Sequence, residues 1–307
     1  MIEMMSDILA LFANSFYGSL FVGAICPLLG VFFILRRMVF LGIAVPQFAA
    51  AGVSFGFLLL PAWNCLWSDD DCHSHDEGSF CFHLFFAMLF TFAALLVLVW
   101  IGRAKRGSPE GRIAAAYSLA AAATILFLTG SALGTSHIDV LLKGEILAIS
   151  DEGFLAITVF FGLALLLFVF FRRDFLLIAY DEEAAVSLGK NPVAWDVLLY
   201  LLVGAVISVG VLTVGPLVVF GLMVIPPLAA RLVAFNMLSF YLFSSLIGIV
   251  TAFGGFVASF LLDWPLGPTV VVTAFGFLVL VWAGRSLTGI LIRRTNDPPQ
   301  RPARVGG

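Results

Sequence analysis

Residues 181–192 read Asp181-Glu182-Glu183-Ala184-Ala185-Val186-Ser187-Leu188-Gly189-Lys190-Asn191-Pro192, a short polar stretch in a mostly apolar chain. Asp181 is a good N-cap residue, and the acidic residues after it suit the positive end of a helix dipole. Gly189 can adopt the left-handed conformation that closes a helix, and Pro192 prevents the helix from resuming. We therefore expect about two turns of helix over residues 181–189, too short to be stable alone.

The sequence on both sides of this stretch is typical of a membrane protein. Of the 307 residues, 62% are hydrophobic and 11% are charged, and the mean hydropathy is +1.10. A soluble domain carries about a quarter charged residues. A bilayer core about 30 Å thick needs roughly 20 apolar residues per helix, and the spans that we predict are 18–35, 38–60, 82–101, 113–133, 153–171, 194–212, 213–230, 238–262 and 267–284.

The sixth and seventh of these spans form one apolar run that Gly210, Gly215 and Pro216 interrupt. The run is too long for one straight helix and barely long enough for two, so it is either a kinked element or a pair. We therefore predict an all-α, polytopic membrane protein with eight or nine transmembrane helices. We expect residues 1–292 to form a single transmembrane domain and the Pro-rich residues 293–307 to form a disordered tail.

The distribution of charge predicts the orientation, because Lys and Arg mark short cytoplasmic loops. Nine spans with an external N-terminus place every group of basic residues except Lys143 in the cytoplasm, together with residues 181–192 and the C-terminus. All four histidines then lie outside. The first basic residue is Arg36, so no cleavable signal peptide is evident and the first span is retained.

Several classes of function are disfavoured by what the chain lacks. It has no Gly-x-x-x-x-Gly-Lys-[Ser/Thr] phosphate-binding loop, so it cannot hydrolyse ATP itself. No nucleophile–base arrangement or His-Glu-x-x-His lies within a span, which argues against an intramembrane enzyme. The spans hold few ionisable residues of the kind that couple secondary transport to protons or sodium. No basic face indicates nucleic acid as a partner.

Five motifs follow one another in an order that resembles the metal-ion ABC permease family, which includes zinc and manganese importers. They are Arg36-Arg37-Met38 with Leu41-Gly42, residues 142–149, residues 181–189, residues 214–231 and residues 263–269. The related iron-chelate and cobalamin permeases carry a His where this chain has Pro227, which favours the metal-ion branch.

The resemblance implies a type II importer-like bundle similar to the cobalamin permeases, in a prokaryotic cytoplasmic (inner) membrane. It also implies a homodimer, a separate ATP-binding cassette ATPase and an extracytoplasmic solute-binding protein, with no permanently bound cofactor. The cargo would be zinc or manganese, and the alternative cargo is iron or a chelated metal. Secondary transport is the alternative mechanism. Residues 181–189 would be the coupling helix that meets the ATPase. The alternative, an ordinary capped helix in a loop, remains open. The candidate contacts of the coupling helix with the ATPase are Asp181, Glu182, Glu183, Ala184, Ala185, Ser187, Leu188 and Gly189.

One departure from the family concerns the intramembrane pathway. The family commonly carries Gly-Asp-x-x-x-His in its second span, which puts a carboxylate and an imidazole on one helix face. Here Ile43 and Gln47 replace them, and Gln47 offers only a neutral carbonyl oxygen. Three explanations remain open. The ion crosses the membrane with fewer protein ligands, the cargo is not a bare ion, or residues elsewhere supply the ligands.

Four further residues are pathway candidates. Cys26 is either a replacement ligand or a buried thiol beside a kink. Pro226 and Pro227 end the glycine-rich motif. Asp196 is either a functional carboxylate inside the membrane or a helix cap paired with Lys190.

The external connection 67–83 concentrates residue types that bind metal ions. Its candidate ligands are Asp71, Cys72, His73, His75, Asp76 and His83. Imidazole and thiolate are preferred zinc ligands, and carboxylates raise the local concentration of cations. Either this loop collects Zn²⁺ at the entrance, or it is an acidic loop whose histidines are incidental. Three external cysteines, Cys65, Cys72 and Cys81, leave any disulfide pairing undetermined.

Overall fold

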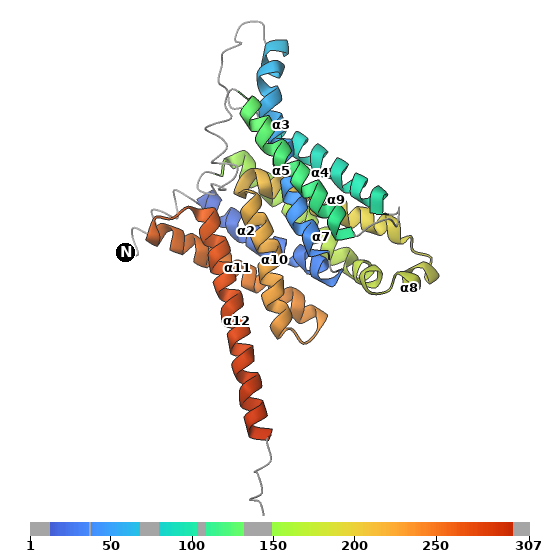
Figure 1. Cartoon of the computed structure of the whole chain (residues 1–307), viewed down its shortest axis with the longest axis vertical. Helices are drawn as coiled ribbons and strands as arrows, with labels where there is room; N and C mark the ends of the chain where they lie inside the picture. Colours follow the sequence, from blue (N-terminus) through green and yellow to red (C-terminus); the bar gives the residue numbers. More distant parts are fainter. Residues whose placement is uncertain (1–12, 37, 68–79, 103–108, 132–148, 297–307) are drawn as a thin grey trace, which may run out of the picture.

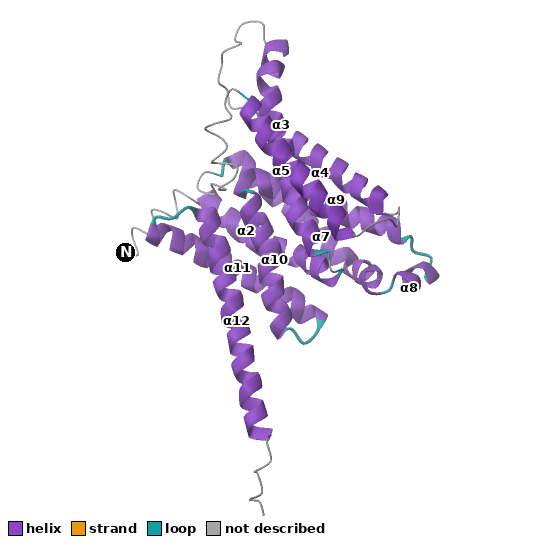
Figure 2. Cartoon of the chain, viewed as in Figure 1, coloured by secondary structure: helices purple, strands orange, loops and turns teal. Residues whose placement is uncertain are grey.

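The computed structural model describes residues 13–36, 38–67, 80–102, 109–131 and 149–296. Over these residues all regular structure is helical, as Figure 2 shows. The helices are α2 (Ala13–Leu35), α3 (Val39–Trp67), α4 (Phe80–Gly102), α5 (Pro109–Gly130), α7 (Asp151–Tyr180), α8 (Glu182–Ser187), α9 (Pro192–Val214), α10 (Pro216–Val233), α11 (Met237–Leu262) and α12 (Leu266–Asn296). Nine of them, all except α8, are long and apolar enough to cross a membrane. This count resolves the choice between eight and nine spans in favour of nine for the described part of the chain.

The boundary between α9 and α10 explains why the sixth and seventh spans were hard to separate. Gly215 has a φ of 87°, in the region that favours glycine, and Pro216 occupies the first turn of α10. Gly210 lies inside α9 and does not interrupt it. The 18 residues of α10 span about 27 Å, just under the thickness of a bilayer core.

Two predicted boundaries differ from the structure. The fifth span does not end at Phe171, because α7 continues without a break to Tyr180. Its 30 residues measure about 45 Å, so the helix extends well beyond a bilayer core of about 30 Å. The last helix, α12, ends at Asn296, beyond the tail boundary expected at residue 292, and Figure 1 shows it projecting past its neighbours.

The most buried helices, α2, α3, α9 and α10, lie at the centre of the bundle, and α4, α5, α7 and α12 lie at its periphery. α2 crosses α11 closely because Gly23 and Gly248 face each other, and a Cβ on either glycine would overlap the opposite backbone. Small residues of this kind let membrane helices approach without a solvent-driven force. α4 and α5 both pack on α3 and make little contact with each other.

Candidate functional site

The end of α7 and the start of α8 share one residue, Asp181. Its backbone N–H donates to the carbonyl oxygen of Leu177 at 2.9 Å and so completes α7. Its carboxylate oxygen Oδ1 accepts a hydrogen bond from the N–H of Ala184 at 2.9 Å and so caps α8. The predicted N-cap is confirmed, and no flexible linker separates the two helices.

The far end of α8 closes as the glycine predicts. Gly189 has a φ of 76°, and its N–H donates to the carbonyl oxygen of Val186 at 2.9 Å. Asn191 then caps α9, because its Oδ1 accepts from the N–H of Val193 at 3.1 Å, and Pro192 is the first residue of α9. Residues 181–191 therefore form a compact hairpin-like connection between two long helices.

The covered face of α8 holds two of the candidate contacts, Ala184 and Ala185. Ala185 is fully buried against the rest of the chain and Ala184 is half-buried, so neither is presented outward. Val186 and Leu188 are instead 57% and 66% exposed. The outward face thus carries two large apolar side chains, together with the exposed residues Glu183, Ser187 and Gly189.

Contacts between α7 and α9 brace the connection from behind. Lys190 forms an ion pair with Asp174 of α7. Its Nζ also lies 5.4 Å from the centroid of the Trp195 ring, within the range of a cation–π interaction. Trp195 packs edge to face on Phe171 and Phe175, with ring centroids 5.3 and 5.7 Å away. These contacts tie the end of α7 to the start of α9.

Asp196 forms a different ion pair from the one expected. Its Oδ1 lies 2.6 Å from the Nη2 of Arg36, which follows α2, whereas Lys190 pairs with Asp174. Burial disfavours the charge on Arg36, but hydrogen bonding and attraction to Asp196 outweigh it and raise the pKa of the guanidinium. Asp196 therefore ties α9 to α2 and is engaged structurally.

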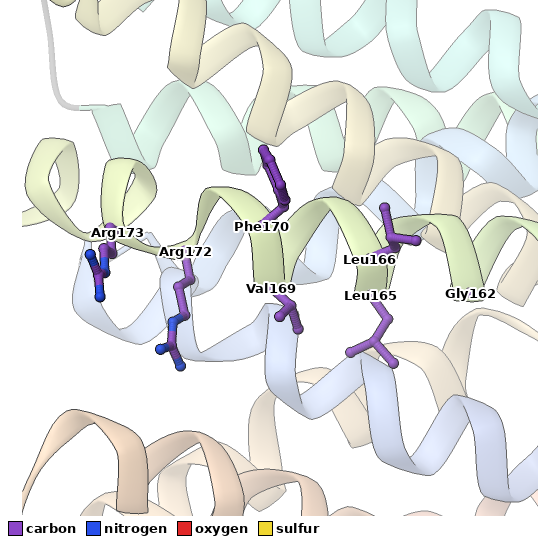
Figure 3. A pocket seen from close by; sticks show the side chains of 7 residues that line it. All are labelled: Gly162, Leu165, Leu166, Val169, Phe170, Arg172 and Arg173. Carbon is purple, nitrogen blue, oxygen red and sulfur yellow. The ribbon is translucent and has the colours of Figure 1, made fainter.

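A hollow of about 670 Å³ follows the exposed side of α7. Figure 3 shows the apolar side chains that line it, with two arginines at the end nearest α8. The lining residues are Gly162, Leu165, Leu166, Val169, Phe170, Arg172 and Arg173. Because this lining includes neither an acidic side chain nor a His or Cys, the hollow offers a metal cation no side-chain ligand.

The pathway candidates are distributed over several helices. Gln47 is half-buried on α3, and its Nε2 donates to Thr124 Oγ1 of α5 at 3.3 Å. Cys26 is fully buried beside Pro27 in α2, the environment expected of a packing thiol. Pro226 and Pro227 are buried inside α10. In the part of the chain that the structure describes, no three or more His, Cys, Asp or Glu side chains are arranged so that they could hold a metal ion.

Of the candidate ligands in the external loop, only His83 is described. It lies in α4, is 4% exposed and packs beside Phe57, with ring centroids 4.2 Å apart. Its side chain is therefore shielded from solvent, and its role as a metal ligand stays a prediction. The other five candidates, Asp71, Cys72, His73, His75 and Asp76, lie outside the described residues.

Three residues of this region were absent from our candidates: Asp174, Val186 and Trp195. Val186 belongs to the same short helix, but the sequence does not reveal which of its faces is covered. Asp174 lies in the stretch that we predicted to be a loop, and Trp195 lies in the predicted sixth span. Phe171 and Phe175 are four residues apart, so they lie on one face of a helix. This spacing could have indicated that α7 continues past Phe171 with an aromatic face.

Comparison with known proteins agrees with the helical architecture and extends over most of the chain. Residues 9–284 match the family described as the ABC 3 transport family. A protein of Haemophilus influenzae named "Probable iron transport system membrane protein" is 28% identical over 73% of this chain and 81% of its own length. The "Manganese transport system membrane protein MntC" of Halalkalibacterium halodurans is 25% identical over 90% of this chain and 88% of its own.

A solved structure shares the fold. It is described as "PsaBC from Streptococcus pneumoniae in complex with Fab", and it superposes with a TM-score of 0.77 at 23% identity, covering 92% of this chain and 95% of the other.

Proposed function

The chain belongs to the ABC 3 transport family, and we propose that it is the membrane-spanning permease subunit of an ABC transporter that imports a divalent metal ion, zinc or manganese. The name of the manganese transport relative supports the cargo. In this proposal a separate subunit hydrolyses ATP, and an extracytoplasmic binding protein delivers the metal. The chain spans the cytoplasmic membrane of a prokaryote, with α8 and the C-terminus inside.

The observation that carries the proposal is the construction of the α7–α8–α9 connection. Ala185 anchors α8 to the bundle while Val186 and Leu188 face outward. Large apolar side chains on a short, well-capped surface helix are typical of a docking element. We assign this outward face to contact with the ATPase.

Coupling then follows from rigid connections. When two ATPase subunits close, they push on α8; the shared cap at Asp181 passes the push to α7, and the Lys190–Asp174 pair passes it to α9. The Arg36–Asp196 pair extends it to the end of α2. The helices tilt as packed units and switch the accessible side of the pathway.

A second copy of the chain would complete the pathway. The exposed side of α7 bears the hollow of Figure 3, which is apolar within the membrane and basic at its inner end. We place the partner copy of the homodimer along this helix. Cysteine substitution at Leu166, which is 63% exposed, should give chain-to-chain crosslinks, whereas the same substitution at Ile157, fully buried on α7, should not.

Iron or a chelated metal is the second candidate for the cargo. The side-chain amide nitrogen of Gln47 donates a hydrogen bond to Thr124, and Ile43 offers no ligand atom. A bare metal ion therefore finds few ligands on this face of α3. The name of the Haemophilus influenzae relative points the same way. Uptake of Zn²⁺, Mn²⁺ and iron, each measured separately in cells that lack other importers, separates the two candidates.

The role of the external loop is tested apart from transport. A peptide of residues 67–83 should bind Zn²⁺ at micromolar concentration if the loop collects metal. Absence of binding would reject the collecting role, and transport by the permease would be unaffected by that result.

A further inference from the structure

A groove opens between α4 and α5, which diverge from a common base on α3. Its volume is about 730 Å³, and Phe48 and Ala51 of α3 form its floor. Alanines on both walls keep it open, including Ala93 of α4 and Ala115 of α5. Both walls belong to helices that are little buried and long enough to span a membrane.

The groove has an apolar length and one charged end. Among the described residues that line it, Arg112 alone carries a charge, and it stands at the first turn of α5. The distribution of basic residues places this end of α5 at the cytoplasmic surface of the membrane. From Arg112 to Ala123, the last lining residue of α5, the helix rises about 16 Å. One leaflet of a bilayer core is about 15 Å thick, half of the whole.

The walls of the groove favour a hydrocarbon chain. Apart from Arg112, the side chains that line it are those of alanine, leucine, phenylalanine and valine. Water finds no hydrogen-bonding partners along apolar walls. Within a bilayer, a hydrocarbon chain is therefore the occupant that fits.

We propose that this groove binds one acyl chain of an anionic phospholipid of the cytoplasmic leaflet, whose headgroup phosphate is held by Arg112. A guanidinium pairs with phosphate through charge-assisted hydrogen bonds. Basic pockets between membrane helices on the cytoplasmic side are known to take anionic headgroups. The lipid fills the space between α4 and α5 and holds both against α3, next to the Gln47–Thr124 hydrogen bond at the deep end. This inference does not depend on the identity of the transported metal.

The first experiment measures lipid retained by the full-length chain in native mass spectrometry, with phosphatidylglycerol and phosphatidylcholine of identical acyl chains. Arg112→Gln should lower the preference for phosphatidylglycerol about fivefold, and Arg231→Gln, an exposed arginine on α10, should leave it unchanged. Ala93→Phe should fill the groove and release the lipid, whereas Ala122→Phe, exposed on α5 outside the lining, should retain it. The proposal would be overturned if the Ala93→Phe variant retained as much lipid as the unaltered chain. It would also be overturned if Ala93→Phe and Ala122→Phe lost the same amount of lipid.

The second experiment needs no substitution in the groove. Phosphatidylglycerol with a photoreactive diazirine in its acyl chain is added to the unaltered protein and activated. Adducts should concentrate in residues 89–98 and 112–123, and adducts confined to other helices would overturn the assignment. If Ala115→Cys instead forms covalent chain dimers in native membranes and residues 112–123 take up no lipid label, a second copy of the chain covers the groove and the proposal is wrong.

Discussion

Truncation of Leu188 is the sharpest test of the docking face. In the chain by itself Leu188 is 66% exposed, so Leu188→Ala removes little that stabilises the permease. Substitutions at such surface positions change the free energy of unfolding by less than about 0.5 kcal/mol. If an ATPase covers this side chain, the same substitution removes apolar area from the interface.

The expected size of the effect follows from the exposed fraction. Burying a whole leucine side chain contributes about 1.5–3 kcal/mol. About two thirds of Leu188 remain to be buried, which corresponds to about 1–2 kcal/mol of binding free energy. The dissociation constant for the ATPase should therefore rise about 5- to 30-fold.

The assay is a titration of the detergent-purified permease with its ATP-binding subunit, followed by metal uptake in reconstituted vesicles. Leu261→Ala, which alters a similarly exposed leucine near the C-terminal end of α11, serves as the matched control and should bind the ATPase normally. Ala185 is unsuitable for this purpose, because a large charged side chain at this buried position would disturb the seat of α8 itself. Unchanged affinity and unchanged uptake in Leu188→Ala would refute the docking role of this face.

Three other predictions concern the scaffold and are measured by thermal unfolding in detergent. Gly248→Ala should cost about 1–3 kcal/mol, because a Cβ would overlap the backbone of α2, whereas Gly254→Ala on the same helix meets no atom within 4 Å and should cost less than about 0.5 kcal/mol; similar losses would contradict the close crossing of α2 and α11. Gly215→Ala should cost about 1–3 kcal/mol, since its φ of 87° and ψ of 156° lie in a region that is open essentially to glycine alone. An unchanged midpoint would contradict the sharp break before α10. Lys190→Met and Asp174→Asn, made singly and together, should show a coupling energy of about 0.5–1 kcal/mol that falls as salt is added, while additive effects would mean that the pair does not brace the loop.

Local chemistry explains which predictions succeeded. Asp181 caps α8, Gly189 closes it and Pro192 opens α9, because capping depends on residues within a few positions of one another. The break at Gly215 was visible for the same reason. The number of spans followed once this break was known to separate two helices.

Predictions that depended on contacts between distant segments were less successful. Asp196 pairs with Arg36, which lies far away in the sequence, and the nearer Lys190 pairs elsewhere. His83 belongs to a metal-binding pattern in the sequence, but its ring is buried beside Phe57. The fifth span was predicted to end at Phe171, just before Arg172 and Arg173, because charges usually mark the membrane surface. The helix α7 nevertheless continues to Tyr180, since a helix need not end where the bilayer does.

By itself, the sequence determined that this protein spans a membrane and where its short polar helix begins and ends, and it predicts which side of the membrane the basic loops occupy. These properties follow from hydropathy, charge and capping, which act along the chain over a few residues or one span. Only the tertiary structure decided which face of that helix is free, since Ala185 and Leu188 differ in burial through contacts with other helices. It also decided that α4 and α5 diverge on α3 and leave a groove, because packing between segments that are far apart in sequence depends on their relative position in space.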